Sequence, residues 1–167
     1  MDQVGNVESQ ASGMSSGCAL VATDGSPSAI AAARAALTIL GSDHVVNLVT
    51  IVPPAYDPSQ DAGGFEGPVM TEEEARREHQ SDVVEANASL AETAEATRPD
   101  LHSEVISSER SVADTLVELA EQRQAAVIVV GHEQHGLLHD LFLGSVAERL
   151  VRHARCPVLV VPEISSP

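Results

Sequence analysis

The sequence predicts one α/β domain, a five-stranded and mainly parallel sheet between two helix layers in an α/β/α sandwich. Residues 125–130 form a continuous, mostly β-branched apolar run without alternation, which is typical of a strand covered on both faces. Five short apolar segments alternate with segments of helical periodicity, and this order favours right-handed crossovers between parallel strands. The 167 residues, of which 43% are hydrophobic, suffice for one such core.

We expect the domain to span residues 18–162. Residues 1–17 are polar, rich in Ser and Gly and without periodicity, which is typical of a mobile tail, and residues 163–167 form a second tail. The chain has no run of about 18 apolar residues, and its first residues lack the basic start and apolar core of a secretion signal. These features predict no membrane segment and a cytoplasmic location.

The first predicted strand spans residues 18–22 and leads into a helix. Ser26 is a typical N-cap, Pro27 suits the first helical position, and Gly41 marks the helix end. Apolar side chains at spacings of three and four predict the face that lies on the sheet. They are Ile30, Ala33, Leu37 and Leu40.

The second predicted strand, residues 45–52, ends at two prolines. The following segment, residues 55–69, is longer than most connections, so it is either a lid over a site or a loop without function. Thr71 and Glu74 match a capping box, and the helix that they begin should end near Thr97, before a proline. The buried face predicted for this helix consists of Val83, Ala86, Leu90 and Ala94.

Residues 101–107 are predicted to form the third strand, and their lower apolar content indicates a sheet edge. Ser111 is the expected N-cap of the next helix. The inner face of that helix should consist of Val112, Leu116, Leu119 and Ala120.

The fourth strand is followed by the last helix and the last strand. Ser145 and Glu148 match a second capping box, with Val146, Leu150 and Val151 on the buried side. A proline precedes the last strand, residues 158–161, which favours the other sheet edge. A short aliphatic edge strand can pair with a second copy, so we predict a homodimer through Val158, Leu159, Val160 and Val161.

A strand order of 3-2-1-4-5 would bring Asp24 and Gly131 to opposite sides of one crevice. In open parallel sheets, ligands bind in the crevice outside the carboxyl ends of the strands where the strand order reverses. A glycine there lets the backbone approach a phosphate.

The two cysteines, Cys18 and Cys156, stand beside the first and the last predicted strand. In the predicted strand order another strand lies between these two strands, so we expect two buried thiols and no disulfide.

The charge of the chain excludes several classes of function. The formal net charge is −16, from 25 acidic and 9 basic residues, and every basic residue is Arg. Nucleic acid and anionic membranes would be repelled, and 2% aromatic residues provide no stacking platform. A chain without Lys cannot form the usual phosphate-binding loop with its lysine, and no nucleophile motif is present, so we expect no catalytic residues. The acidic excess fits either a salt-adapted source or codon bias.

Three histidines lie in and after the turn that follows the fourth strand: His132, His135 and His139. A zinc site would lack cysteine ligands there, and Glu133 is the one adjacent carboxylate, so we predict no metal site. Partly protonated histidines near a phosphate would instead give pH-dependent affinity.

Three segments resemble the universal stress protein family. Residues 21–26 (VATDGS) resemble its first strand with the following Asp, and residues 129–131 (VVG) with 144–146 (GSV) resemble its nucleotide-binding segment. Residues 154–161 (ARCPVLVV) resemble its closing strand. The resemblance covers about residues 18–162. It implies a doubly wound, Rossmann-like fold of the adenine nucleotide alpha hydrolase type, in small stress-induced cytoplasmic proteins that are usually dimeric through the last strand.

The ATP-binding branch of this family carries the motif Gly-x2-Gly-x9-Gly followed by Ser or Thr. Counted from Gly131, the second glycine position holds Gln134, and the third is Gly144, followed by Ser145. Gly136 stands where many members also have glycine. A side chain at position 134 restricts φ and fills space near a phosphate, although its amide can donate a hydrogen bond. The departure therefore predicts ATP binding that is weakened or redirected rather than lost.

The resemblance implies a role for each site residue. Asp24 would accept from a ribose hydroxyl or hold Mg²⁺, the alternative being a turn residue. Ala22 and Ile51 would flank the adenine, and Val130 would close the pocket. Ser145, at a helix start, would offer its hydroxyl and nearby N–H groups to a phosphate, the alternative being a helix cap. The predicted nucleotide site comprises Ala22, Thr23, Asp24, Ile51, Val130, Gly131, Gln134, Gly136, Gly144, Ser145 and Val146.

The function predicted from the sequence is that of a cytoplasmic universal stress protein. It would bind an adenine nucleotide, with ATP as the expected ligand, with or without Mg²⁺, and occupancy would change contacts with its dimer partner or with a protein that the sequence does not identify. A nucleotide-free dimeric interaction scaffold, a cyclic AMP binder and a slow, incidental ATPase are the alternatives.

Overall fold

The computed structural model of the chain describes residues 17–41, 44–55, 71–132 and 144–162. Most of the two predicted tails and of the segment 55–69 lie outside the described residues. So do two predicted site residues, Gln134 and Gly136, and the histidines His135 and His139.

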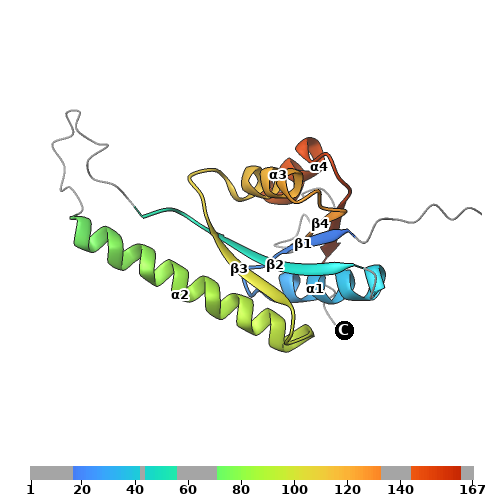
Figure 1. Ribbon diagram of the computed structural model, residues 1–167, viewed down its shortest axis with the longest axis horizontal. Coiled ribbons are helices and arrows are strands. Elements are labelled where there is room, and N and C mark those ends of the chain that lie inside the picture. Colours follow the sequence, from blue (N-terminus) through green and yellow to red (C-terminus); the bar gives the residue numbers. More distant parts are fainter. Residues whose placement is uncertain (1–16, 42–43, 56–70, 133–143, 163–167) are drawn as a thin grey trace, which may run out of the picture.

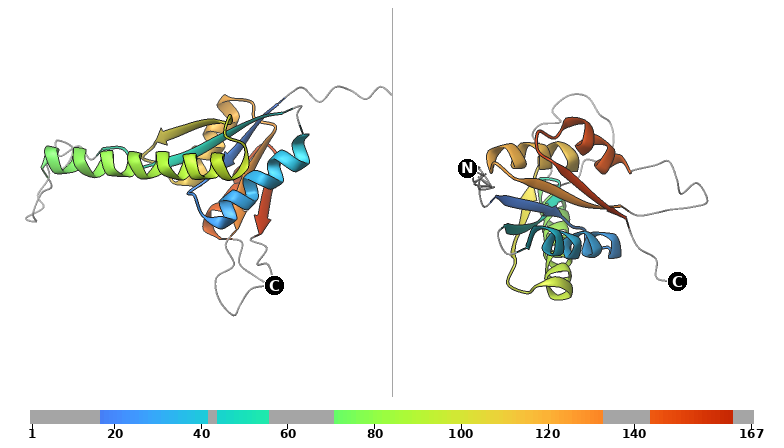
Figure 2. Two further views of the ribbon diagram at one scale, coloured as in Figure 1. Left: turned by 90° about the horizontal axis from the view of Figure 1, so that it is seen from below. Right: turned by 90° about the vertical axis from the view of Figure 1, so that its right-hand side faces the viewer.

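Five parallel strands form one sheet in the order β3-β2-β1-β4-β5, which confirms the predicted topology. Their bounds are β1 (Cys18–Ala22), β2 (Val45–Val52), β3 (His102–Ser107), β4 (Val127–His132) and β5 (Val158–Pro162). The helices are α1 (Pro27–Leu40), α2 (Glu72–Thr97), α3 (Val112–Gln122) and α4 (Ser145–His153). Helices α1 and α2 cover one face of the sheet and α3 and α4 the other, while the start of α2 extends beyond the sheet (Figures 1 and 2).

The core is divided into two parts by the sheet. Alternate residues of the central strands point to opposite faces, so Ala19 and Val21 pack towards α1 and α2, whereas Leu20 packs towards α3 and α4. All three are fully buried. Burial on both faces explains why the central strands are continuously apolar instead of alternating.

Local capping chemistry determines where three of the helices begin, as predicted. Ser26 caps α1 by accepting a hydrogen bond from the Ala29 N–H (3.3 Å), with proline in the first turn. The capping box of α2 is complete, because Thr71 Oγ1 accepts from the Glu74 N–H (3.2 Å) and Glu74 Oε2 accepts from the Thr71 N–H (2.8 Å). Ser111 caps α3.

The start of α4 differs from the prediction. Its N-cap is Gly144, with φ 68° and no side-chain hydrogen bond, and Ser145 is already the first helical residue. Glu148 pairs with Arg152 (2.7 Å), so the predicted Ser145/Glu148 capping box is wrong. The left-handed backbone at Gly144, which glycine adopts without steric cost, shifts the helix start by one residue.

The buried faces of three helices also differ from the predicted ones. In α1 the most buried side chains are small, namely Ser28, Ala29, Ala32, Ala33 and Ala36, while Ile30, Leu37 and Leu40 are partly buried. Small residues let the helix backbone approach the sheet closely. Val112 of α3 and Val151 of α4 are 39% and 58% exposed, because each lies beyond the stripe that faces the sheet.

Candidate functional site

A cavity of about 260 Å³ opens at the carboxyl ends of β1, β2 and β4, where the strand order reverses. It brings together seven of the predicted site residues: Ala22, Thr23, Asp24, Ile51, Val130, Gly131 and Val146. Gly144 and Ser145 lie immediately before Val146, at the start of α4. The cavity is also lined by residues that were not predicted to belong to the nucleotide site: Ser26, Ser28, Ala29, Val49, Thr50 and Val112.

Three helices begin at this cavity. Ser26 and Ser28 from the start of α1, Val112 from α3 and Val146 from α4 all line it. The first N–H groups of a helix have no partner within the helix, and they carry the positive end of its dipole. Ser26 and Ser111 cap two of these helices, whereas α4 has no side-chain cap hydrogen bond. The start of α4 therefore offers backbone donors to an anion.

The loop after β1 carries the acidic residue of the cavity. Asp24 is exposed, and its Oδ1 accepts a hydrogen bond from the Ser26 N–H (3.0 Å), which stabilises the turn. Gly25 has φ 80°, a conformation that favours glycine. A carboxylate can make the turn bond with one oxygen and still accept from a ligand with the other, so the turn role and the predicted ligand role are compatible.

The Thr23 side chain contacts α2. Its hydroxyl accepts from the Gly25 N–H (3.1 Å) and lies 2.7 Å from the hydroxyl of Thr93, which donates to the Ser89 carbonyl (2.8 Å). The Thr23 carbonyl accepts from Thr50 Oγ1 (2.7 Å). Thr23 thus connects the cavity loop with two other elements. Sequence patterns could not identify Thr93 as a partner, because a lone threonine in a helix has no distinctive signal.

Gly131 is required by helix packing. A Cβ at this position would lie 2.5 Å from the carbonyl carbon of Ser28 and 2.7 Å from the Ala29 backbone nitrogen, closer than real atoms approach. The sequence suggested that a glycine here lets the backbone approach a phosphate. In the structure, its absent side chain makes room for the backbone of α1.

All nine basic residues of the chain are arginines, and each is engaged with an acceptor. Arg34 donates to the Ala96 carbonyl (3.1 Å). The other eight form the ion pairs Arg76–Glu72, Arg77–Glu73, Arg98–Asp100, Arg110–Glu118, Arg123–Glu104, Arg149–Asp114, Arg152–Glu148 and Arg155–Glu121. A phosphate in the cavity would therefore meet backbone N–H groups and hydroxyls rather than an unengaged arginine.

These ion pairs also change the acidity of their members. The hydrogen bonds from Arg149 hold the pKa of Asp114 below its ordinary value, and those from Arg123 do the same for Glu104. Cys18 and Cys156 are free, half-buried thiols with β4 between their strands, and burial raises the pKa of both.

Two further features concern metals and membranes. Within the part of the chain that the structure describes, no group of three or more His, Cys, Asp or Glu side chains is arranged to hold a metal ion. His132 ends β4 and is half-buried. Among the helices of the same described residues, none is long and apolar enough to cross a membrane.

Several known proteins are similar to this chain in sequence. A universal stress protein from Methanocaldococcus jannaschii is 32% identical over 146 residues, which are 85% of this chain and 79% of that protein. One from Mycobacterium tuberculosis is 29% identical over 89% of this chain, which spans about half (49%) of that longer relative.

Solved structures of the family have the same fold. An Arabidopsis thaliana universal stress protein with AMP bound has a TM-score of 0.58 at 18% identity, covering 89% of this chain and 93% of the other. A universal stress protein in complex with cAMP has a TM-score of 0.53 at 20% identity, covering 90% and 99%. The model of the universal stress protein family matches residues 19–162. The chain therefore belongs to the universal stress protein family.

Proposed function

We propose that this chain is a cytoplasmic regulatory protein of the stress response that binds an adenine nucleotide in the cavity between β1 and β4. The observation that carries the proposal is the start of α4, whose first N–H groups have no side-chain cap and lie beside Val146 of the cavity wall. Membership of the family, and the nucleotides bound to the solved relatives, support adenine nucleotides as the ligand class. ATP is the particular ligand that we propose, because Gly144 and Ser145, the end of the family's ATP-binding motif, are present.

The chemistry of the cavity suits the three parts of a nucleotide. Ala22, Ile51 and Val130 provide apolar surface for the base. Asp24 can accept a hydrogen bond from a ribose hydroxyl or hold Mg²⁺ on a polyphosphate. The start of α4, at Gly144 and Ser145, provides donors for a phosphate.

The engaged arginines lead to an expectation about phosphate number. Because the protein carries a net charge of −16 and its arginines are paired, each further phosphate charge must be balanced by backbone donors or by a cation. We therefore expect Mg²⁺ to strengthen the binding of ATP much more than that of AMP.

The first test is to identify what the protein carries. Protein purified without added ligand is denatured, and the supernatant is analysed by liquid chromatography and mass spectrometry. Titration calorimetry then compares ATP with and without Mg²⁺, AMP and cyclic AMP, with GTP as the control for the base. An empty supernatant and no heat or thermal shift at millimolar nucleotide would overturn the proposal and favour a nucleotide-free interaction scaffold.

Asp24→Asn tests the site itself. The amide oxygen can still accept from the Ser26 N–H, so the turn is retained while the charge is removed. If Asp24 holds Mg²⁺, the variant loses the effect of Mg²⁺ on ATP affinity. If it contacts only the ribose, the affinities for AMP and ATP fall together. Unchanged affinity for every nucleotide would contradict both roles.

We also propose a homodimer through β5. This strand lies at a sheet edge, and its residues from Val158 to Val161 are only half-buried within one chain. An unpaired edge strand with aliphatic side chains favours pairing with another strand. Sedimentation at tens of micromolar protein tests this proposal, and a monomer mass would contradict it.

A further inference from the structure

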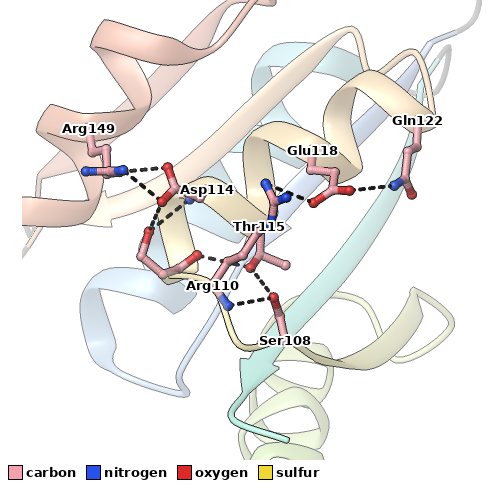
Figure 3. Close-up of polar contacts among 8 residues, drawn as sticks. Ser108, Arg110, Asp114, Thr115, Glu118, Gln122 and Arg149 are labelled. Carbon is pink, nitrogen blue, oxygen red and sulfur yellow. Dashed lines mark hydrogen bonds and ion pairs between the residues drawn. The ribbon is translucent and has the colours of Figure 1, made fainter.

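Asp114 and Arg149 join two helices that lie side by side on one face of the sheet (Figures 1 and 3). Asp114 is in the first turn of α3, and Arg149 is in α4. The guanidinium donates two hydrogen bonds to the carboxylate, Nε to Oδ1 at 2.7 Å and Nη2 to Oδ2 at 2.8 Å. A two-point contact of this kind fixes orientation as well as distance.

The carboxylate of Asp114 is itself held in place (Figure 3). The Ser111 hydroxyl donates to Oδ2 (2.8 Å) and accepts from the Asp114 N–H (3.2 Å). The hydroxyl of Thr115, a buried residue, contacts that of Ser108 (2.8 Å), which ties the same turn to the end of β3. Asp114 therefore presents a fixed acceptor to α4.

The pair lies directly behind the cavity wall. Val112 and Val146 line the cavity. Asp114 follows Val112 by two residues and Arg149 follows Val146 by three, which are about 3 Å and about 4.5 Å along the helix axes. The ion pair thus joins the start of α3 to the middle of α4, about one turn beyond the wall residue Val146.

A second ion pair joins the end of α3 to the segment that follows α4. Arg155 Nε lies 3.1 Å from Glu121 Oε1. Glu121 follows Val112 by nine residues, about 13 Å along α3. This pair has the same charges as the first and also begins on α3, but its arginine lies two residues beyond the end of α4 and the pair is remote from the cavity. It is therefore a control for the loss of one charge and one ion pair on α3.

We propose that Asp114 and Arg149 are positioning residues of the nucleotide site, which hold α4 against α3 just beyond its first turn and thereby raise nucleotide affinity. The inference rests on the proposed function for its effect on affinity. Its structural part, the anchoring of α4, does not depend on a bound nucleotide.

The sign of one substitution separates positioning from simple electrostatics. Asp114 is a negative charge near a site for an anion. If only its charge mattered, Asp114→Asn would strengthen nucleotide binding, because a repulsive charge is removed. If the pair positions α4, the same substitution weakens binding, because the charge-assisted bidentate contact is lost.

The binding experiment uses the full chain and AMP in titration calorimetry. We expect Asp114→Asn and Arg149→Gln each to weaken AMP binding roughly threefold to fivefold, the range expected for an exposed but well-oriented ion pair. Glu121→Gln, which also removes one negative charge from α3 and breaks an ion pair of that helix, should leave affinity within about twofold. Equal or tighter binding by Asp114→Asn would overturn the proposal.

Hydrogen exchange in the ligand-free protein provides a second measurement. Exchange in the peptide covering residues 145–153 should be faster in Asp114→Asn and Arg149→Gln than in wild type, and should be unchanged at its start in Glu121→Gln. Unchanged exchange in both test variants would overturn the anchoring. If wild type bound no nucleotide while exchange rose only in the test variants, the proposed function would fail and the anchoring would stand.

Discussion

The hydroxyl pair between Thr23 and Thr93 provides a quantitative test of how the cavity loop is held. Thr93 is fully buried and Thr23 is 5% exposed. The Thr93 proton is donated to the Ser89 carbonyl (2.8 Å), so its oxygen is left to accept from Thr23 (2.7 Å). The Thr23 oxygen in turn accepts from the Gly25 N–H (3.1 Å). The series of hydrogen bonds therefore has one direction: Gly25 donates to Thr23, Thr23 donates to Thr93, and Thr93 donates to Ser89.

Thr93→Val removes the acceptor of the Thr23 hydroxyl while it keeps the branched shape of the side chain. The Thr23 O–H proton is then buried without an acceptor, although its oxygen still accepts from the Gly25 N–H, and the unsatisfied donor costs about 1–3 kcal/mol in the free energy of unfolding. With a urea dependence of about 2 kcal/mol per M, the midpoint of urea unfolding should fall by about 0.5–1.5 M.

The control is Thr38→Val. Thr38 is exposed, and its hydroxyl makes the same kind of bond to the carbonyl four residues earlier, that of Arg34 (2.8 Å). We expect its free energy of unfolding to change by less than about 0.5 kcal/mol. The reasoning would be refuted if Thr93→Val unfolded at the same urea concentration as Thr38→Val, both measured by far-ultraviolet circular dichroism.

Two further predictions concern the pH dependence of stability and the packing of Gly131. Folding lowers the pKa of Glu104 because Arg123 donates hydrogen bonds to its carboxylate, so its contribution to stability is present at neutral pH and is lost as the pH falls through the lowered pKa of the folded state. Glu104→Gln should therefore be less stable than wild type at neutral pH, with a difference in urea midpoint that shrinks as the pH falls below 4.5, the ordinary value, and on towards the lowered pKa of the folded state. Gly131→Ala should destabilise by more than about 2 kcal/mol, because its Cβ would overlap the α1 backbone. Gly41→Ala, whose Cβ would meet no atom within 4 Å, should cost about 1–3 kcal/mol in thermal or urea unfolding from backbone strain alone, because φ 63° and ψ −157° are adopted almost only by glycine.

Each of these predictions has an internal control. Glu72→Gln alters an ion pair whose carboxylate is 75% exposed, and it should not change the pH dependence. An unaltered pH dependence in Glu104→Gln would show that the Arg123 contact does not stabilise the fold. A loss below about 1 kcal/mol for Gly131→Ala, whose own backbone is not strained, would contradict the close approach of α1 to β4.

The sequence predicted the features that depend on neighbouring residues. The N-caps at Ser26, Thr71 and Ser111 were predicted correctly because the donor and acceptor lie within three residues of each other. The strand order followed from alternating strands and helices and from the edge character of the third and fifth strands. Seven predicted site residues meet at one cavity because the topology brings them to the same sheet edge.

Features that depend on distant contacts were missed. The alanine-rich buried face of α1 was not predicted, because hydrophobicity ranks leucine and isoleucine higher, while close packing against the sheet selects small side chains. The contact of Thr23 with Thr93 spans 70 residues and leaves no local pattern. The cap of α4 was assigned to Ser145 because that residue matches the capping box, but the backbone conformation of Gly144 determines the start.

The contact between Gly131 and the start of α1 has a consequence for comparing members of this family. Since the glycine is needed for the helix to lie against the strand, a descendant that no longer used any ligand would still be selected to keep it. Its presence in a related sequence is therefore evidence of an intact fold and carries little information about ligand use. Substitutions at Asp24 or at the start of α4, where the packing constraint is absent, are the better record of whether a lineage has kept or abandoned its ligand.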